Sequence, residues 1–202
     1  MIPMKILILS GFLGSGKTSA LLLLAKYLVE RSQSASENKV MILENEVGEI
    51  GIDDAFLRGG GFKVDTLFSG CACCSVSGEL VSSVERILHE YAPDWLILET
   101  TGVAYPKNIQ KTLMDVCGLE SRIAVLVDAS RWKRLRLPMQ GLLSGQIIGS
   151  DAVLVNKIDL VDEATLAEVD GDVLGFEPAA NIVHISALAP VSPAVWDGVL
   201  GL

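Results

Sequence analysis

The feature of this sequence that most constrains its fold is an apolar strand that runs directly into a glycine-rich loop. Residues 5–10 read Lys-Ile-Leu-Ile-Leu-Ser, and residues 11–18 follow with the pattern Gly-x-x-x-x-Gly-Lys-Thr. Such a loop turns backbone N–H groups toward an anion, and a helix that begins at its end points its positive dipole at the same place. The nearly all-apolar stretch 20–29 predicts that helix. The sequence therefore predicts a phosphate-binding P-loop.

The side chains at the end of this loop have distinct expected roles. Lys17 brings a positive charge to the β- and γ-phosphates of a nucleotide, and the Thr18 hydroxyl is an expected Mg²⁺ ligand. The pattern alone also fits an ordinary glycine-rich turn, but the strand before it and the helix after it favour the P-loop. The residues expected to contact nucleotide here are Gly11, Gly14, Ser15, Gly16, Lys17, Thr18 and Ser19.

The rest of the chain alternates strand-like apolar runs with helical stretches, which is typical of a parallel α/β sheet. Half of the residues are apolar and only 5% are aromatic, which suits strands of Val, Ile and Leu. We predict a three-layer P-loop NTPase fold, mostly parallel with helices on both faces, in a single domain over residues 1–202. The expected strands are 5–10, 39–44, 63–68, 95–99, 122–128, 152–156 and 181–186. The expected helices are 18–31, 78–91, 107–117, 140–149 and 163–169.

Charge and cysteine usage exclude several classes of partner. The net charge is −9 and the basic run 131–136 is short, so we expect no nucleic acid partner and read that run as a solvated helix face. No apolar stretch is long enough to span a bilayer, and no signal-peptide cleavage site precedes the P-loop, so we expect a cytoplasmic protein. Three of the four cysteines lie within residues 71–74, unlike a secreted disulfide framework.

Polar clusters follow four of the predicted strands. In a parallel α/β sheet, ligands bind at the carboxyl ends of the strands, where residues 44–49, 99–102, 156–159 and 186–188 fall. Each cluster alone could be a helix cap or a turn, but four clusters placed alike favour one common site.

The sequence Asn-Lys-Ile-Asp at 156–159 indicates which base is bound. The Asp159 carboxylate can accept from the ring N–H and the exocyclic amine of guanine, whereas adenine would leave it unpaired. Lys157 is expected to lie over the base, and Asn156 to tie this segment to the P-loop. The backbone after the last strand is then expected to reach the guanine carbonyl oxygen. The residues of that segment are Ser186, Ala187 and Leu188.

The segment after the fourth strand carries the expected hydrolytic residues. Glu99 is expected to hold a water of Mg²⁺ or to orient the attacking water. The alternative is a purely structural role, as a buried glutamate at the end of a strand that is satisfied by backbone groups. The Gly102 N–H can sense a γ-phosphate because glycine permits close approach. Asp53 or Asp54 is expected to approach the Mg²⁺ from the other side.

Three clustered thiols, Cys71, Cys73 and Cys74, predict a transition-metal site. A helix that begins near residue 78 would lower their pKa values, and sulfur ligands favour Zn²⁺, Co²⁺ or Ni²⁺ over Mg²⁺. Adjacent cysteines point in different directions, so three thiols on one ion need a tight, irregular loop, and the residues favour two of the thiols with an acid from 44–49 as the ligand set. The alternative to a metal site is that these thiols are buried or redox-reactive and bind no metal.

Taken together, these motifs resemble the GTPase domain of the CobW family, within the CobW/UreG/HypB/MeaB group of P-loop metallochaperone GTPases. The resemblance runs over about residues 4–188, and Gly-Cys-x-Cys-Cys at 70–74 is the element that marks CobW-like proteins. The other segments that carry it are 11–18, 44–49, 99–102, Gln146 with Asp151, and 156–159.

The resemblance implies slow GTP hydrolysis to GDP that times the delivery of a transition metal to a client metalloenzyme or a metal-insertion partner. It points to Glu44, Glu49 and Cys73 as metal ligands. Cobalamin biosynthesis is one pathway the family implies, and a nucleotide-dependent homodimer is a further expectation. Few residues follow Leu188, so we expect the C-terminal domain of many CobW-like proteins to be absent. Two alternatives stay open: a GTP-gated switch for a corrinoid or other metalloenzyme that carries no metal itself, and a redox-sensing regulator.

Overall fold

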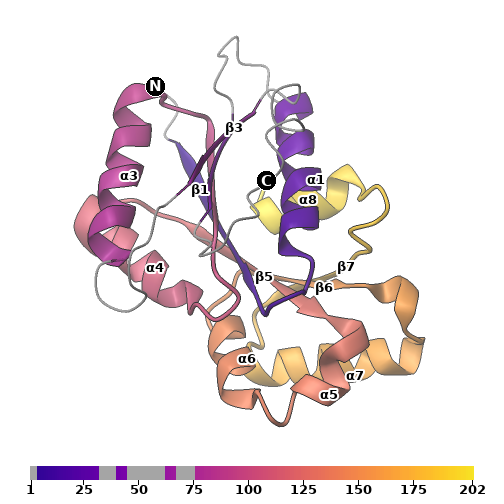
Figure 1. Ribbon diagram of the computed structural model, residues 1–202. Coiled ribbons are helices and arrows are strands. Elements are labelled where there is room, and N and C mark those ends of the chain that lie inside the picture. Colours follow the sequence, from indigo (N-terminus) through magenta and orange to yellow (C-terminus); the bar gives the residue numbers. More distant parts are fainter. Residues whose placement is uncertain (1–3, 32–39, 45–61, 67–75) are drawn as a thin grey trace.

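The structure is a computed structural model that describes residues 4–31, 40–44, 62–66 and 76–202. Its strands form one sheet in the order β3-β2-β4-β1-β5-β6-β7, and every neighbouring pair is parallel (Figure 1). This confirms the predicted α/β fold. The strands are β1 (Lys5–Gly11), β2 (Val40–Glu44), β3 (Phe62–Thr66), β4 (Trp95–Glu99), β5 (Arg122–Asp128), β6 (Ala152–Asn156) and β7 (Asn181–His184).

Helices connect these parallel strands. The α-helices are α1 (Lys17–Arg31), α3 (Val76–Glu90), α4 (Pro106–Thr112), α5 (Trp132–Leu135), α6 (Gln140–Ile147), α7 (Glu163–Phe176) and α8 (Pro193–Leu200). The shorter helical segments are η1 (Leu113–Cys117), η2 (Ala129–Arg131) and η3 (Ile158–Leu160). No helix in these described ranges combines the length and the hydrophobicity that crossing a bilayer requires.

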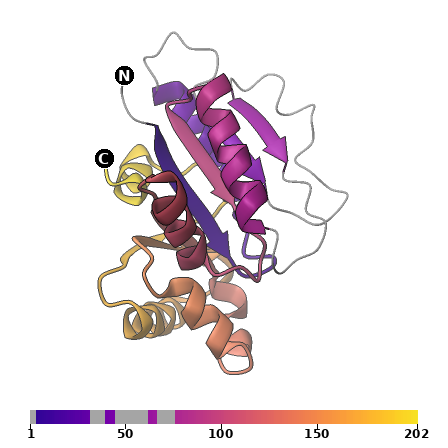
Figure 2. The same ribbon diagram turned by 90° about the vertical axis from the view of Figure 1, so that its left-hand side faces the viewer.

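The sheet separates two apolar layers because successive strand residues point to opposite faces. In β1, Leu7 and Leu9 pack with α1 and α8 on one face, whereas Ile6 and Ile8 pack with α3, α6 and α7 on the other. Figure 2 shows α3 lying across the face of the sheet that is opposite to α1. The central strand therefore has helices on both sides, and its carboxyl end leads straight into the P-loop.

The helices differ from the sequence prediction near the C-terminal half. The helix predicted over 163–169 continues to Phe176, because Val169 and Val173 are both fully buried one turn apart. Gly171 and Gly175 lie within this helix, and open space surrounds both positions, so packing does not require glycine there. Helix α8 was not predicted, although Pro193 in its first turn is a recognised start signal.

The helix predicted over 107–117 is divided in two. Helix α4 ends at Thr112, and the chain continues as the π-helical turn η1. Gly118, in the left-handed region with φ of 66°, ends this turn, and its N–H donates back to the carbonyls of Leu113 and Met114.

The basic run 131–136 contributes α5 and faces acidic residues of α7. Lys133 Nζ lies 3.2 Å from Glu168, and Arg136 Nη1 lies 3.0 Å from Asp172. The indole N–H of buried Trp132 also donates to Asp172, at 2.8 Å. Buried Trp132, with its bond to Asp172, therefore anchors α5 against α7, whereas the exposed charges of the run contribute little.

Candidate nucleotide-binding site

The P-loop joins β1 to α1, and two of its glycines occupy positions that admit no side chain. Gly11 has a φ of 144°, and a Cβ there would lie 2.4 Å from the carbonyl oxygen of Leu126 on β5. Gly16 has a φ of 95°, and its Cβ would lie 2.4 Å from Asn156 Nδ2. Both glycines of the sequence pattern are thus required by the close approach of β5 and β6.

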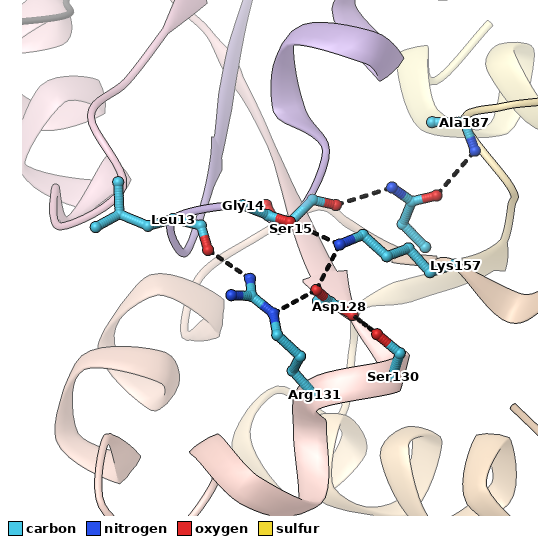
Figure 3. A network of polar contacts seen from close by, with 9 residues as sticks. Leu13, Gly14, Ser15, Asp128, Ser130, Arg131, Lys157 and Ala187 are labelled. Carbon is cyan, nitrogen blue, oxygen red and sulfur yellow. Dashed lines mark hydrogen bonds and ion pairs between the residues drawn. The ribbon is translucent and has the colours of Figure 1, made fainter. Parts of the chain in front are cut away.

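Three successive carbonyls of the P-loop accept hydrogen bonds from side chains that follow β5 and β6 (Figure 3). Arg131 donates to the carbonyl of Leu13, Lys157 Nζ to that of Gly14 at 2.8 Å, and Asn156 Nδ2 to that of Ser15 at 2.8 Å. The carbonyl and the following N–H of a trans peptide point in opposite directions. These bonds therefore turn the amides of Gly14 and Gly16 away from the three donors, as an anion-binding loop requires.

Asn156 also connects the P-loop to the segment after β7. Its Oδ1 accepts from the Ala187 N–H at 2.9 Å while its Nδ2 bonds to Ser15. The side chain is 2% exposed, so the buried amide has partners at both ends. The structure thus brings together the P-loop, Asn156 and the segment 186–188, as the sequence predicted. Asp159 is exposed in η3, next in the chain to this connection.

The expected Mg²⁺ residues meet at the ends of β1 and β4. The Thr18 hydroxyl donates to Glu99 Oε1 at 3.0 Å, and Glu99 is 2% exposed at the end of β4. Lys17, also buried, donates from Nζ to the Gly11 carbonyl at 3.1 Å. Hydroxyl and carboxylate oxygens are the ligand types that Mg²⁺ takes, so these residues fit the ion. Ser19 is exposed in the first turn of α1.

Asp128, at the end of β5, is a site residue that the sequence analysis missed, and so is Arg131, which was expected in a solvated helix face and instead donates to the P-loop. Asp128 Oδ2 accepts from Lys157 Nζ at 2.7 Å and from Arg131 Nε at 2.6 Å, and its Oδ1 accepts from Ser130 at 2.6 Å (Figure 3). Its position was a usable signal, because it is an acid at the carboxyl end of a buried strand. Through Lys157 and Arg131, this one carboxylate fixes two of the three groups that hold the P-loop carbonyls.

The pKa of Asp128 is set by opposing effects. Burial raises the pKa of this carboxyl, but hydrogen bonds from Lys157, Ser130 and Arg131 favour the charged form and bring the pKa below its ordinary value. The carboxylate is therefore ionised at neutral pH and pairs with two cations. A group with a lowered pKa stabilises the fold above its ordinary pKa, and this contribution is lost as the pH falls through its folded-state pKa.

Replacement of Asp128 by asparagine is expected to destabilise the protein in a pH-dependent way. At neutral pH the loss is about 1–3 kcal/mol, because Lys157 and Arg131 lose their counter-charge. The difference from the wild type begins to shrink below about pH 4, where the unfolded chain takes up the proton first, and it is lost as the pH falls through the lowered folded-state pKa of the Asp128 carboxyl. Urea unfolding of both proteins over this pH range measures the difference in the free energy of unfolding. The control is Asp115→Asn, which removes the charge of an exposed acid. A difference that does not change with pH would contradict the assigned role.

The loop after β4 lies against the P-loop. A Cβ on Gly102 would lie 2.6 Å from the Leu13 side chain and 2.8 Å from its backbone nitrogen. Gln146 of α6 donates from Nε2 to the carbonyls of Gly102 at 3.1 Å and Ala104 at 3.0 Å. The predicted γ-phosphate sensor thus sits directly beside the P-loop, and a buried side chain holds it there.

Glu44 and Glu99 are aligned in neighbouring strands. They are register partners on β2 and β4, and both are almost fully buried. Register partners in a parallel pair present their side chains on the same face of the sheet. The first acid of the predicted metal segment therefore lies beside the Glu99 that contacts Thr18.

The remaining predicted metal ligands lie outside the described residues. They are Glu49, Asp53, Asp54, Cys71, Cys73 and Cys74. Within the described ranges, no three His, Cys, Asp or Glu side chains gather closely enough to hold a metal ion. The thiol-containing metal site thus stays a prediction.

Known proteins resemble this chain in sequence and in fold. Zinc chaperone YjiA of Escherichia coli is 30% identical over 172 residues, which cover 80% of this chain and 52% of that protein. Zinc chaperone CobW of Sinorhizobium sp is 28% identical over 198 residues, or 82% of this chain and 54% of that protein. The chain thus spans about half the length of the curated relatives it matches.

Solved structures share the fold. The crystal structure of Zn(II)-bound YjiA GTPase from E. coli superposes with a TM-score of 0.66 at 21% identity, covering 100% of this chain and 63% of that one. The crystal structure of hydrogenase maturation factor HypB from Archaeoglobus fulgidus superposes with a TM-score of 0.63 at 20% identity. The match covers 91% of this chain and 81% of that one. The sequence matches the family described as CobW/HypB/UreG, nucleotide-binding domain, over residues 5–184. Because that match runs from β1 through β7, the chain belongs to the CobW/HypB/UreG family of nucleotide-binding domains.

Proposed function

We propose that this chain binds and hydrolyses GTP and couples the cycle to delivery of a transition metal, Zn²⁺ in the first place, to a client protein. The observation that carries the proposal is the alignment of Glu44 with Glu99. Glu99 contacts the Thr18 hydroxyl at the expected Mg²⁺ position, and Glu44 begins the segment that leads to Glu49. A change at the γ-phosphate can therefore reach Glu44, the first of the predicted metal ligands, across one pair of adjacent strands.

The choice of guanine is supported by the position of Asp159. Asn156 fixes the start of the segment 156–159 to the P-loop, and Asp159 follows in the exposed turn η3. Lys157 has a φ of 64°, and the Nζ at the end of its aliphatic stem donates both to the P-loop carbonyl of Gly14 and to Asp128. A ring that lies over this stem could present its N–H and amine edge to the Asp159 carboxylate.

The chemistry of the chain's own residues in hydrolysis is mainly electrostatic. In phosphoryl transfer the protein positions the phosphates and compensates the charge that spreads over them. Lys17 supplies positive charge, the P-loop amides supply fixed donors, and Gly102 supplies a further N–H for the γ-phosphate. Mg²⁺, held through Thr18 and waters near Glu99, would neutralise the β- and γ-oxygens. The turnover expected for such a site without a partner is slow.

The names of the relatives support zinc as cargo, because YjiA and CobW are both described as zinc chaperones. Thiol and carboxylate ligands at Cys71, Cys73, Cys74, Glu44 and Glu49 would suit a borderline ion such as Zn²⁺. The client is a protein that accepts this ion, either a metalloenzyme or a metal-insertion partner.

Nucleotide state is expected to change metal affinity. We expect Zn²⁺ to bind the protein about 5- to 150-fold more tightly with a non-hydrolysable GTP analogue than with GDP, because a carrier that releases its metal on hydrolysis must hold it more tightly before hydrolysis. Linkage requires Zn²⁺ to tighten the GTP analogue by the same factor. Competition titration of Zn²⁺, and of Co²⁺ by its absorption bands, measures both sides of this linkage.

The cysteine variants make this experiment specific. Cys73→Ser is expected to remove high-affinity metal binding and the effect of metal on nucleotide. Cys117→Ser is the matched thiol control, since Cys117 lies in η1 and its pKa is raised by burial and by Glu85. Equal Zn²⁺ affinities in the two nucleotide states would separate the thiol segment from the GTPase cycle and favour a switch that carries no metal.

A further inference from the structure

We propose that Gln146 is a positioning residue for GTP: it holds the peptide of Gly102 against the P-loop and thereby sets the preference of the site for GTP over GDP. This inference rests on the proposed GTPase function and concerns a residue that would not touch the nucleotide itself. Gln146 lies on α6, whereas the phosphates are expected at the P-loop and the loop after β4.

The Gln146 side chain spans the loop after β4. It is 1% exposed, and its Nε2 donates to both Gly102 and Ala104, at 3.1 and 3.0 Å. A primary amide carries two N–H groups, so one side-chain nitrogen can satisfy both carbonyls. The Ala104 N–H donates in turn to the Thr101 carbonyl at 3.1 Å. The loop 101–104 is therefore a closed turn that is fixed to α6 at two points.

This attachment fixes Gly102, a residue that lies against the P-loop, by its carbonyl, and the N–H of the same residue is the expected donor to the γ-phosphate. Gly102 is buried and approaches Leu13 so closely that a Cβ would overlap both its side chain and its backbone nitrogen. A backbone N–H helps a charged oxygen most when it is already oriented and has no reorganisation to undergo. The γ-phosphate is the group that GTP has and GDP lacks, so a donor held here favours GTP.

Residue 145 of the same helix provides an independent contact with this loop. A Cβ on Gly145 would lie 2.4 Å from Cε1 of Tyr105, so the Tyr105 ring occupies the space that a side chain would take. Gly145 and Gln146 thus contact two successive parts of the segment after β4. The side-chain amide of Gln146 holds residues 102–104, and the absence of a side chain at Gly145 leaves room for the ring of Tyr105. Gly141, one turn earlier in α6, has open space around its Cα.

A purely structural role for Gln146 makes a different prediction. If the amide only filled the core, its loss would lower stability and weaken GTP and GDP together, because both nucleotides share the P-loop and the base contacts. A positioning role acts through the γ-phosphate alone. The ratio of the GTP and GDP affinities therefore separates the two roles.

The first variant is Gln146→Leu, which keeps the approximate size of the side chain and removes both donors. We expect the affinity for a non-hydrolysable GTP analogue to fall about tenfold and the turnover at saturating GTP to fall by a similar factor, while GDP affinity stays within about twofold. Fluorescent-nucleotide titration and phosphate release measure these quantities. Gln140→Leu, an exposed glutamine on the same helix, is the matched control and should change neither.

A second pair of variants keeps the test decisive should Gln146→Leu fail to fold. Gly145→Ala pushes the Tyr105 ring outward and should lower the GTP-to-GDP affinity ratio by about threefold or more. Gly141→Ala makes the same chemical change where there is room and should leave the ratio as in the wild type. An unchanged ratio in the folded variants, or an equal loss of both nucleotides, would overturn the positioning role. A wild-type protein that did not hydrolyse GTP would instead overturn the proposed function.

Discussion

Replacing Lys17 with alanine is expected to lower GTP turnover by about 10²- to 10³-fold while the protein stays folded. The lysine begins α1, is buried, and directs its Nζ back to the Gly11 carbonyl at the mouth of the P-loop. From there the charge can reach the β- and γ-phosphates, where negative charge is redistributed in the transition state. Alanine is the best helix former, so the variant keeps the start of α1.

The measurement for Lys17→Ala is phosphate release at saturating GTP, with thermal unfolding as the check on folding. Lys26→Ala is the matched control, because Lys26 lies on the same helix with an exposed side chain and pairs only loosely with Glu30, at 4.0 Å. The control should keep the wild-type rate. A Lys17→Ala protein that also kept that rate would show that residues 11–18 do not act as a nucleotide-hydrolysing P-loop.

The parts of the fold that depend on local pattern could be predicted from the sequence. The sequence placed the seven described strands to within a few residues, and the central ones most clearly, because buried parallel strands are continuous stretches of Val, Ile and Leu. The bond between Asn156 and the P-loop was also predicted and is confirmed, since it follows from two motifs at the carboxyl ends of β1 and β6. The family assignment rested on the same motifs and is confirmed by the match over residues 5–184.

Residues that act across the sheet could not be predicted in the same way. Asp128 is a single acid with no motif around it, and its importance appears only when β5 brings it beside Lys157. Gln146 was noted as part of the family pattern, but its hydrogen bonds join residues 42 and 44 positions apart in the chain. Such contacts depend on how α6 packs onto the loop after β4, which hydrophobic periodicity does not specify.

The end of α7 shows a similar limit for secondary structure. Gly171 and Gly175 each disfavour a helix locally by about 1 kcal/mol, which makes an early end at Val169 reasonable from sequence. Burial of Val173, which contributes about 1.5–3 kcal/mol, offsets this cost, and Phe176 adds further packing against the same core. Tertiary packing therefore decided the length of this helix.

These contacts suggest how the P-loop is kept ready for phosphate. Its carbonyls at residues 13–15 are held by Arg131, Lys157 and Asn156, which come from β5, β6 and the segments after them. Gly102 covers the same loop from the β4 side. Two of these four groups, Lys157 and Asn156, belong to the base-binding segment, and Gly102 belongs to the predicted γ-phosphate segment. Binding of base and of γ-phosphate can therefore influence each other through the loop itself.

Asp159→Asn is expected to change the base that the protein binds. The wild-type carboxylate accepts from the ring N–H and the amine of guanine, and loss of a charged acceptor costs about 1.5–3 kcal/mol, or roughly 10- to 100-fold in GTP affinity. The asparagine amide can instead accept from the ring N–H of xanthine and donate to its added carbonyl. Xanthosine triphosphate should therefore bind the variant more tightly than GTP does.

Competition titration with four nucleotides tests this base assignment. For the wild type we expect GTP to bind most tightly, inosine triphosphate to be weaker because it lacks the amine, and ATP and xanthosine triphosphate to be weakest. In Asp159→Asn the order of GTP and xanthosine triphosphate should reverse, while Mg²⁺ dependence stays unchanged because Thr18 and Glu99 are untouched. Equal competition by ATP and GTP in the wild type would remove the basis for guanine recognition. A uniform loss of all four nucleotides in the variant would place Asp159 in the support of the loop instead of at the base.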